Sequence, residues 1–472
     1  MALKTVLALI ADTQRPILDE AVYLTLAESI ASEGRFPTTF RPPLYPAFLA
    51  AFLALGLGSV GARLAQAVLS TLTILLVYRI TRRHFGLTVG RVAAGLIAFD
   101  PVLVSFSHRL WSETLFLFLL LVLIDRLLVA IHENGLAPWA VAGLALGLAG
   151  LTRPIILSFA PLLLPWGALQ IQRRRRAATT PAAAGGWTMP SWSGFAARFA
   201  LLTCAALFVV MPWTLRNLEV TGAPILVDSN GPFNFLVGNQ PEAAYVDKDD
   251  FWSERFGRIG GERYEQLVVH DAARAQAAAM ELARANIAAA PDRFLRKAAW
   301  EAQHLWTLDS FLLRHLRNGW YGPRARKWLS PLLTPVSAAF FAGLVIAGFA
   351  GLAVMAPSAF RGFALLYIGH ATLVFGVTYS LSRYAVPLHA LLVVPAAIVL
   401  AAPRLAVERL RWKPQQRLRV ATLCVALLAV AGGWLRDLPV LWDTAVNGGA
   451  AHRYRFERAA AAERPEAAAF AD

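Results

Sequence analysis

The sequence is poor in charge and in cysteine, and both shortages exclude whole classes of protein. Charged residues make up 16% of the 472 residues, whereas hydrophobic residues make up 57%. Soluble domains usually contain about a quarter charged residues. The only cysteines, Cys204 and Cys424, lie inside apolar stretches. They are expected to be small core residues, so the sequence predicts neither a disulfide framework nor a cysteine metal cluster.

Long apolar runs fill most of the chain. A membrane-spanning helix needs about 20 consecutive apolar residues, and many stretches approach this length. They lie at about 60–80, 89–107, 112–131, 138–152, 154–171, 195–213, 332–355, 362–380, 384–402 and 418–436. Residues 3–11 are expected to be the end of a first helix that starts upstream of Met1. The sequence therefore predicts an all-α polytopic membrane protein with a bundle of about 11 transmembrane helices.

Basic residues outnumber acidic ones and give a net charge of +15. The arginines cluster in short loops between apolar runs, so nucleic-acid binding is not expected. Alternate loops carry the clusters, at 79–91, 173–198, 361 and 404–419. Because cytoplasmic loops collect Arg and Lys, this side is predicted to be cytoplasmic. The alternation requires that residues 42–58 lie at the membrane surface and do not span.

This orientation divides the chain into four parts. Residues 1–213 form an N-terminal transmembrane catalytic module with a first outer loop at 12–59. Residues 214–330 form an outer soluble segment, which cannot build a large core alone and is expected to cover the membrane part as a lid. Residues 331–436 are predicted as C-terminal transmembrane helices, and residues 437–472 as an outer tail.

Ionisable residues gather on the predicted outer side. Asp19 and Glu20 start a predicted helix that runs to about Ser32. Asp19 either caps this helix or accepts a proton from an attacking hydroxyl. Arg41 either contacts lipid headgroups or binds a phosphate through two hydrogen bonds. Glu113 follows the third predicted span on the same face, where it also suits the positive end of a helix dipole.

Short motifs occur in a particular order along the chain. They are Asp19-Glu20 with Tyr23, Arg41-Pro42-Pro43-Leu44-Tyr45-Pro46, Arg82-Arg83-His84-Phe85-Gly86, Ser112-Glu113, Leu151-Thr152-Arg153-Pro154, Pro212-Trp213-Thr214-Leu215-Arg216-Asn217, Gly238-Asn239 and Ser382-Arg383-Tyr384 with Pro387. The ordered set resembles bacterial GT-C membrane glycosyltransferases, specifically the protein-mannosyltransferase and aminoarabinose-transferase-like group. Each motif is weak alone, and together they run from residue 19 to about 390.

The resemblance implies a glycosyltransferase. Its donor would be a polyprenyl-phosphate sugar, attacked by a hydroxyl of a glycan, lipid or protein acceptor outside the bacterial cytoplasmic (inner) membrane, in the periplasm or exterior. Asp19 matches the family's first-loop acid, which implies a general base or an acceptor-orienting group. Glu113 matches the second acid, where several relatives carry Asp. Arg41 matches the basic residue before the paired prolines, which is Lys in the aminoarabinose transferases. Because Arg and Lys bind phosphate differently, a different donor sugar or carrier pose is expected.

The candidates for the donor phosphate are the outer-face residues Arg41, Arg153 and Arg383. The motifs and their neighbours supply further supporting candidates: Glu20, Tyr23, Tyr45, His108, Arg109, Arg216, Asn239 and Tyr384. No spacing of histidines and carboxylates predicts a zinc site. A divalent cation between the carboxylates and the phosphate is compatible with the chemistry, although nothing requires one.

Two other functions stay open. A transporter or flippase of lipid-linked intermediates is expected to show paired repeats and polar residues near the bilayer midplane, and no repeat is evident. A non-catalytic assembly or polymer-ligation partner would keep its function after the loss of Asp19.

Overall fold

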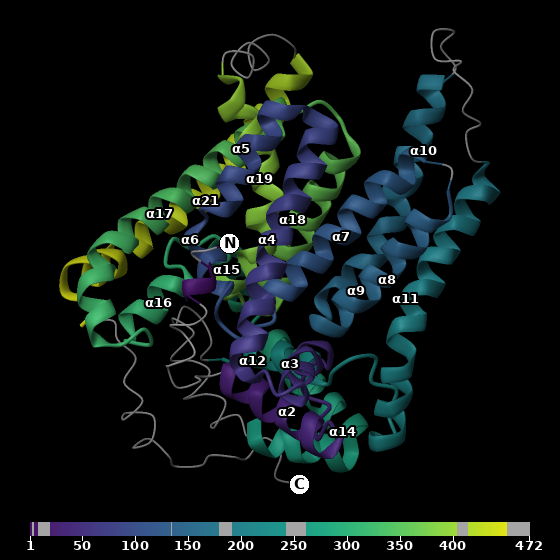
Figure 1. Ribbon diagram of the computed structural model, residues 1–472, viewed down its shortest axis with the longest axis vertical. Coiled ribbons are helices and arrows are strands. Elements are labelled where there is room, and N and C mark those ends of the chain that lie inside the picture. Colours follow the sequence, from purple (N-terminus) through teal and green to yellow (C-terminus); the bar gives the residue numbers. More distant parts are fainter. Residues whose placement is uncertain are drawn as a thin grey trace.

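The computed structural model describes residues 1, 4–7, 19–133, 135–178, 191–241, 261–403 and 414–450. Within those ranges the regular elements are helices (Figure 1). The first half contains α2 (Asp19–Glu33), α3 (Leu44–Ala54), α4 (Gly58–Phe85), α5 (Leu87–Ala98), α6 (Pro101–Phe106), α7 (Glu113–His132), α8 (Ala137–Thr152), α9 (Ile155–Phe159), η1 (Ala160–Leu162), α10 (Leu163–Ala178) and α11 (Trp192–Thr221). The second half contains α12 (Asn230–Gly238), α14 (Gly261–Ala289), α15 (Pro291–His304), α16 (Phe311–Arg317), α17 (Pro323–Val354), α18 (Ala359–Val377), η3 (Ser382–Ala385), α19 (Val386–Ala401) and α21 (Pro414–Asn447).

Eight helical segments in the described part of the chain are long and apolar enough to cross a membrane. Three more apolar helices, α3, α5 and α8, are shorter. The predicted all-α polytopic fold is confirmed, while the number of about 11 spans stays a prediction. Residues 42–58 contain the short helix α3, and their place at the membrane surface also stays a prediction.

The span predicted after α4 is two helices. α5 ends before Asp100, and α6 begins at Pro101, which has no amide hydrogen to donate. Asp100 caps α6 by accepting hydrogen bonds from the amides of Val102 and Leu103 at 2.9 and 3.1 Å. Its second oxygen lies 2.5 Å from His389 Nδ1. The break is therefore fixed against α19.

The bundle core is built around α7, which is buried on almost every side and packs against α4, α8 and α19. α8 approaches α11 closely because it presents glycine there. A Cβ added at Gly143 would lie 2.2 Å from the carbonyl oxygen of Leu202. Such close backbone contact through small residues is typical of helices that associate in membranes.

Cys204 and Cys424 are exposed on α11 and α21, so the expectation that they are core residues is wrong. Both helices also expose large apolar side chains, such as Phe208 and Leu428. An apolar stretch therefore did not distinguish the core from the outer surface of the bundle.

The helical bundle has two distinct ends. α2, α3, α12 and α14 lie together at one end, and the last turns of α10 lie at the other (Figure 1). At this second end the turn after α4, the last turns of α10 and the start of α18 surround one cavity. Three of the four basic loops therefore share one end, as predicted. Residues 404–413 of the fourth loop lie outside the described residues.

The predicted outer segment packs onto the first loop. α12 and α14 form one apolar cluster with Phe40 of the first loop and with Tyr379 and Leu381 of the turn before η3. α11 continues to Thr221 and α21 to Asn447, so the predicted boundaries at 213 and 436 fall inside helices. The division into four parts stays a prediction.

Candidate active site

A cavity of about 350 Å³ lies where α2, the turn before α3, the α8–α9 junction, the turn into α12, the end of α18 and η3 meet. Five charged side chains line it: Asp19, Arg41, Arg153, Asp228 and Arg383. Four of these were predicted as site residues from motifs far apart in the sequence. The fold therefore brings the first predicted carboxylate and all three predicted arginines to one place.

Asp19 is the first residue of α2, and its carboxylate joins two of the arginines. Its Oδ1 lies 3.2 Å from Arg41 Nη2, and its Oδ2 lies 2.5 Å from Arg383 Nη1. Both oxygens are thus engaged in ion pairs inside the cavity. The carboxylate links the first loop to η3 across 364 residues of chain.

Electrostatics keep Asp19 ionised. Burial raises the pKa of this carboxyl, but the charges of Arg41, Arg383 and Arg153 outweigh burial and lower the pKa to about 2. A carboxylate with so low a pKa is a weak base at neutral pH. The contacts of Asp19 suit a residue that positions guanidinium groups better than one that accepts a proton.

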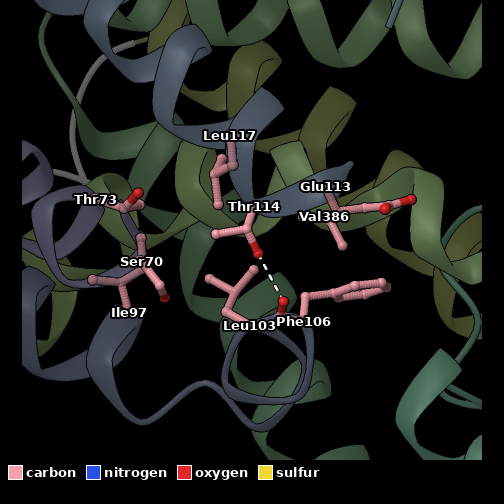
Figure 2. A pocket seen from close by; sticks show the side chains of 9 residues that line it. All are labelled: Ser70, Thr73, Ile97, Leu103, Phe106, Glu113, Thr114, Leu117 and Val386. Atoms are coloured by element: carbon pink, nitrogen blue, oxygen red, sulfur yellow. Dashed lines mark hydrogen bonds between the residues drawn. The ribbon is translucent and has the colours of Figure 1, made fainter. Parts of the chain in front are cut away.

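Glu113 begins α7 behind the cavity wall and is 2% exposed. Its Oε1 pairs closely with Arg153 Nη1 and lies 4.0 Å from Arg383 Nε. Glu113 also lines a separate cavity of about 10 Å³. Its carboxylate is turned away from Thr114 and the other side chains labelled in Figure 2. A space of that size holds about one water molecule. Glu113 therefore does not line the larger cavity but contacts Arg153 and Arg383, which do.

Aromatic rings hold two of the arginines in place. The Arg383 guanidinium carbon lies 4.6 Å from the centroid of the Trp111 ring and 5.5 Å from that of Tyr384. Arg153 lies 5.4 Å from the same Tyr384 ring. Cation–π contacts orient a guanidinium group without neutralising it. Arg153 and Arg383 are thus held in defined orientations on the cavity wall by their ion pairs and by these rings.

Glu20 follows Asp19 but lies beneath the site, 1% exposed. Its Oε1 lies 2.7 Å from Arg63 Nη1, and its Oε2 lies 3.4 Å from Arg109 Nη1. It also accepts a hydrogen bond from the Leu110 amide at 3.0 Å. Glu20 and Arg109, both predicted as supporting residues, therefore join α2 to the α6–α7 turn and do not line the cavity.

Glu20→Gln is expected to lower the free energy of unfolding by about 3–5 kcal/mol, because it leaves two buried guanidinium groups without their carboxylate. The measurement is thermal unfolding of the purified protein followed by tryptophan fluorescence. Glu28→Gln, an exposed position on the same helix, is the matched control. An unfolding temperature for Glu20→Gln equal to that of the control would contradict the structural role.

The other supporting candidates separate into two groups. Tyr23 and Tyr384 line the cavity. Four lie outside its wall and hydrogen-bond within the protein: Tyr45, His108, Arg216 and Asn239. Arg216, for example, donates to the carbonyl of Thr38 at 3.4 Å and so holds the first loop in place.

Asp228 lines the cavity and was not predicted. It lies in the turn between α11 and α12, and its neighbours fix that turn. The Val227 carbonyl accepts a hydrogen bond from Trp213 Nε1 at 2.9 Å. The Ser229 amide donates to the carbonyl of Thr39 in the first loop at 2.8 Å. The Asp228 carboxylate is therefore held at a defined point of the wall.

Burial raises the pKa of Asp228 to about 7, against the opposing effects of the Asn230 amide and the positive charge of Arg41. The Asn230 amide donates to Asp228 Oδ1 at 3.3 Å. A carboxyl group with a pKa near neutral pH is suited to proton transfer. In the sequence, Asp228 is marked only by its position directly after the apolar run Ile225-Leu226-Val227. It does not belong to any of the ordered motifs.

Within the described ranges, no group of three or more His, Cys, Asp or Glu side chains is arranged to hold a metal ion. The two predicted acids, Asp19 and Glu113, pair with guanidinium groups instead.

Together, the apolar spans, the helical bundle and the cationic cavity define a multi-pass membrane protein. Residues 40–189 match the sequence family described as Dolichyl-phosphate-mannose-protein mannosyltransferase. This match, over less than half of the chain, confirms the predicted resemblance to the protein-mannosyltransferase group. A comparison with curated proteins finds no match.

Solved structures also resemble the chain. The Archaeoglobus fulgidus oligosaccharyltransferase, in a complex with Zn and sulfate, aligns with a TM-score of 0.42 and 16% identity over 96% of this chain and 53% of its own. This chain thus spans about half the length of the archaeal protein. ArnT from Cupriavidus metallidurans, bound to undecaprenyl phosphate, aligns with a TM-score of 0.40 and 16% identity over 85% of this chain and 77% of its own.

Proposed function

We propose that this protein transfers a sugar from a polyprenyl-phosphate donor to an acceptor hydroxyl at the outer face of the bacterial cytoplasmic membrane. The observation that carries the proposal is the single cavity lined by Arg41, Arg153, Arg383, Asp19 and Asp228. It lies at the end of the bundle away from the basic loops. The family description, which names a sugar on a polyprenyl-type phosphate, supports the same class of donor.

The charge of the site matches that of the donor. Three guanidinium groups, Arg41, Arg153 and Arg383, pair with two carboxylates, Asp19 and Glu113. The formal charge is +1 while Asp228 is protonated and zero once it is ionised. A sugar linked through phosphate to a polyprenyl chain is a phosphodiester with one negative charge. Its phosphate oxygens accept hydrogen bonds from guanidinium groups with good geometry.

The transfer step assigns a role to each carboxylate. The acceptor oxygen forms a bond to the anomeric carbon while the bond from that carbon to the phosphate oxygen breaks. The electron pair of the broken bond goes to the phosphate, whose growing negative charge the arginines stabilise. Asp228 accepts the proton of the acceptor hydroxyl. Asp19 keeps Arg41 and Arg383 in position and faces the positive character that develops at the sugar carbon.

Apolar side chains in the cavity wall are proposed to contact the lipid part of the donor. Ile155 of α9 and Val374 and Phe375 of α18 line the same cavity as the arginines. A polyprenyl chain gains free energy when it leaves water for such a surface. The phosphate can therefore reach the arginines while its tail stays among the spanning helices. In this proposal the sugar faces the turn that holds Asp228, and the acceptor enters there.

Arg41→Gln is expected to weaken binding of polyprenyl phosphate about tenfold or more, because a charged hydrogen bond to phosphate is lost. The measurement is a titration of the full-length protein in detergent with undecaprenyl phosphate. Arg35→Gln is the matched control, since Arg35 is an exposed arginine near the same loop. Equal affinities of the two variants would contradict a phosphate-binding role for Arg41.

A further inference from the structure

A second cavity, of about 330 Å³, lies at the end of the bundle that carries the basic loops. The ends of α4, α7 and α10 and the beginning of α18 surround it. It shares no lining residue with the candidate active site. Among the described residues that line it, none carries a carboxylate, and several carry hydrogen-bond donors.

Gln170 of α10 is the most informative of these donors. Its side chain lines the cavity and is 4% exposed. Its Nε2 has no hydrogen-bond partner among the described residues. A buried side-chain amide without a partner is uncommon in a folded protein and calls for an explanation. Since an NH₂ group can only donate, a partner for it must offer an acceptor atom.

Positive charge surrounds the Gln170 amide. Arg173 and Arg174, on the next turn of α10, line the same cavity. Arg174 also donates to the carbonyl of Ile131, which fixes it beside the end of α7. An anion that reached Gln170 would thus meet two guanidinium groups on the same helix.

The beginning of α18 adds a third source of positive potential. Ser358 precedes this 19-residue helix, and its hydroxyl accepts the Arg361 amide at 3.2 Å. The amides of Ala359 and Phe360, in the first turn, have no acceptor within the helix. Both residues line the cavity. The first turn of a helix binds anions because its free amides and its dipole favour negative charge.

Two histidine rings complete the wall. The centroids of His84 and His132 lie 5.7 Å apart. His132 Nδ1 lies 2.7 Å from the Leu128 carbonyl, so this nitrogen carries a hydrogen. Nε2 carries a second hydrogen, and can donate it to an anion, only when the ring is protonated. The wall therefore combines guanidinium, amide and imidazole groups without an opposing carboxylate.

We propose that this cavity binds a phosphate group on the predicted cytoplasmic side, either from the headgroup of an anionic membrane lipid or from a soluble phosphorylated molecule. Phosphate oxygens are the acceptors that guanidinium groups and free helix amides bind best. The volume is in the range of sites that enclose small ligands or headgroups. The proposal rests on these contacts alone and does not depend on sugar transfer at the other end.

The test uses the full-length protein with two probes that separate the sources. Native mass spectrometry counts phosphatidylglycerol molecules retained after delipidation, with phosphatidylcholine as the zwitterionic comparison. Thermal unfolding in increasing glycerol phosphate reports the soluble source. Each measurement is made on Gln170→Leu and Arg173→Gln, with Arg176→Gln as the matched control, because Arg176 lies on the same helix and does not line the cavity.

The proposal predicts that retention of phosphatidylglycerol, or stabilisation by glycerol phosphate, falls about tenfold in Gln170→Leu and Arg173→Gln but not in Arg176→Gln. The probe that shows this loss identifies the source of the phosphate. If Gln170→Leu does not fold, the exposed Arg173→Gln decides alone. Absence of binding of both probes to the wild type, or binding that the cavity variants leave unchanged, would overturn the proposal.

Discussion

Asp228→Asn is expected to lower kcat/KM for sugar transfer by about 10²–10⁴-fold, the range in which a positioned general base contributes. The amide keeps the size of the side chain and its hydrogen bond from Asn230, but it cannot accept a proton. The measurement is initial-rate transfer from a polyprenyl-phosphate sugar by the protein in lipid. Asp292→Asn is the control, since Asp292 is 66% exposed on α15 and the substitution changes the net charge equally.

The pH dependence of wild-type transfer tests the same assignment. The pKa of Asp228 is about 7, raised by burial and opposed by Arg41. Among the described residues, Tyr264 is a further titratable group that interacts with it. Below pH 7 the carboxyl is protonated and cannot act as a base. We expect kcat/KM to fall about tenfold per pH unit below 7 and to level off above it. A variant Asp228→Asn that keeps both the rate and this profile would refute the assignment.

Arg383→Gln is expected to lower kcat/KM by about 10²–10³-fold, the cost of removing one oriented donor from a site that stabilises developing negative charge. Arg383 contacts Asp19 and stacks on Trp111, so its loss also frees the carboxylate that positions Arg41. The control is Arg296→Gln, at a 63% exposed position.

Arg383→Lys separates charge from geometry. Lysine keeps the positive charge but cannot form two parallel hydrogen bonds or stack as a plane. Activity is expected to lie between the wild type and Arg383→Gln. Full activity of Arg383→Gln, with an unfolding temperature close to that of the control, would exclude Arg383 from the site.

The spanning helices could be predicted because long apolar runs have few alternatives in a chain of this composition. The break at Asp100 has a local signal, because Pro101 follows it and a proline kinks or ends a helix. Its contact with His389, 289 residues away, has no such signal. Likewise, Cys204 sits in an apolar run that does not reveal which face of α11 is buried. Hydrophobicity indicates a helix in a membrane but not which side faces protein.

The site was predictable in part. Asp19, Arg41, Arg153 and Arg383 belong to motifs and meet in one cavity. Glu20 belongs to the same motif, yet it points elsewhere because neighbouring helical positions are rotated by about 100°. Glu113 was predicted on the same face as Asp19, but its contact with the cavity-lining Arg153 depends on the packing of α7 against α8.

Asp228 was missed for a related reason. Its importance comes from burial against the first loop, through Ser229 and Thr39, and burial of a turn residue leaves no pattern in the sequence. A single acid after an apolar run is also common in turns that have no function. The three-dimensional fold, which places this turn on the cavity wall, was needed to single it out.

The most direct measurement is sugar transfer from a radiolabelled pool of polyprenyl-phosphate donors by the purified protein in lipid, comparing wild type with Asp19→Asn. The account predicts transfer by the wild type. It also predicts a loss of about tenfold or more in a folded Asp19→Asn, because the ionised carboxylate no longer positions Arg41 and Arg383. Equal turnover by wild type and variant would contradict the role of Asp19, and no turnover by wild type with any donor would contradict the proposed function itself.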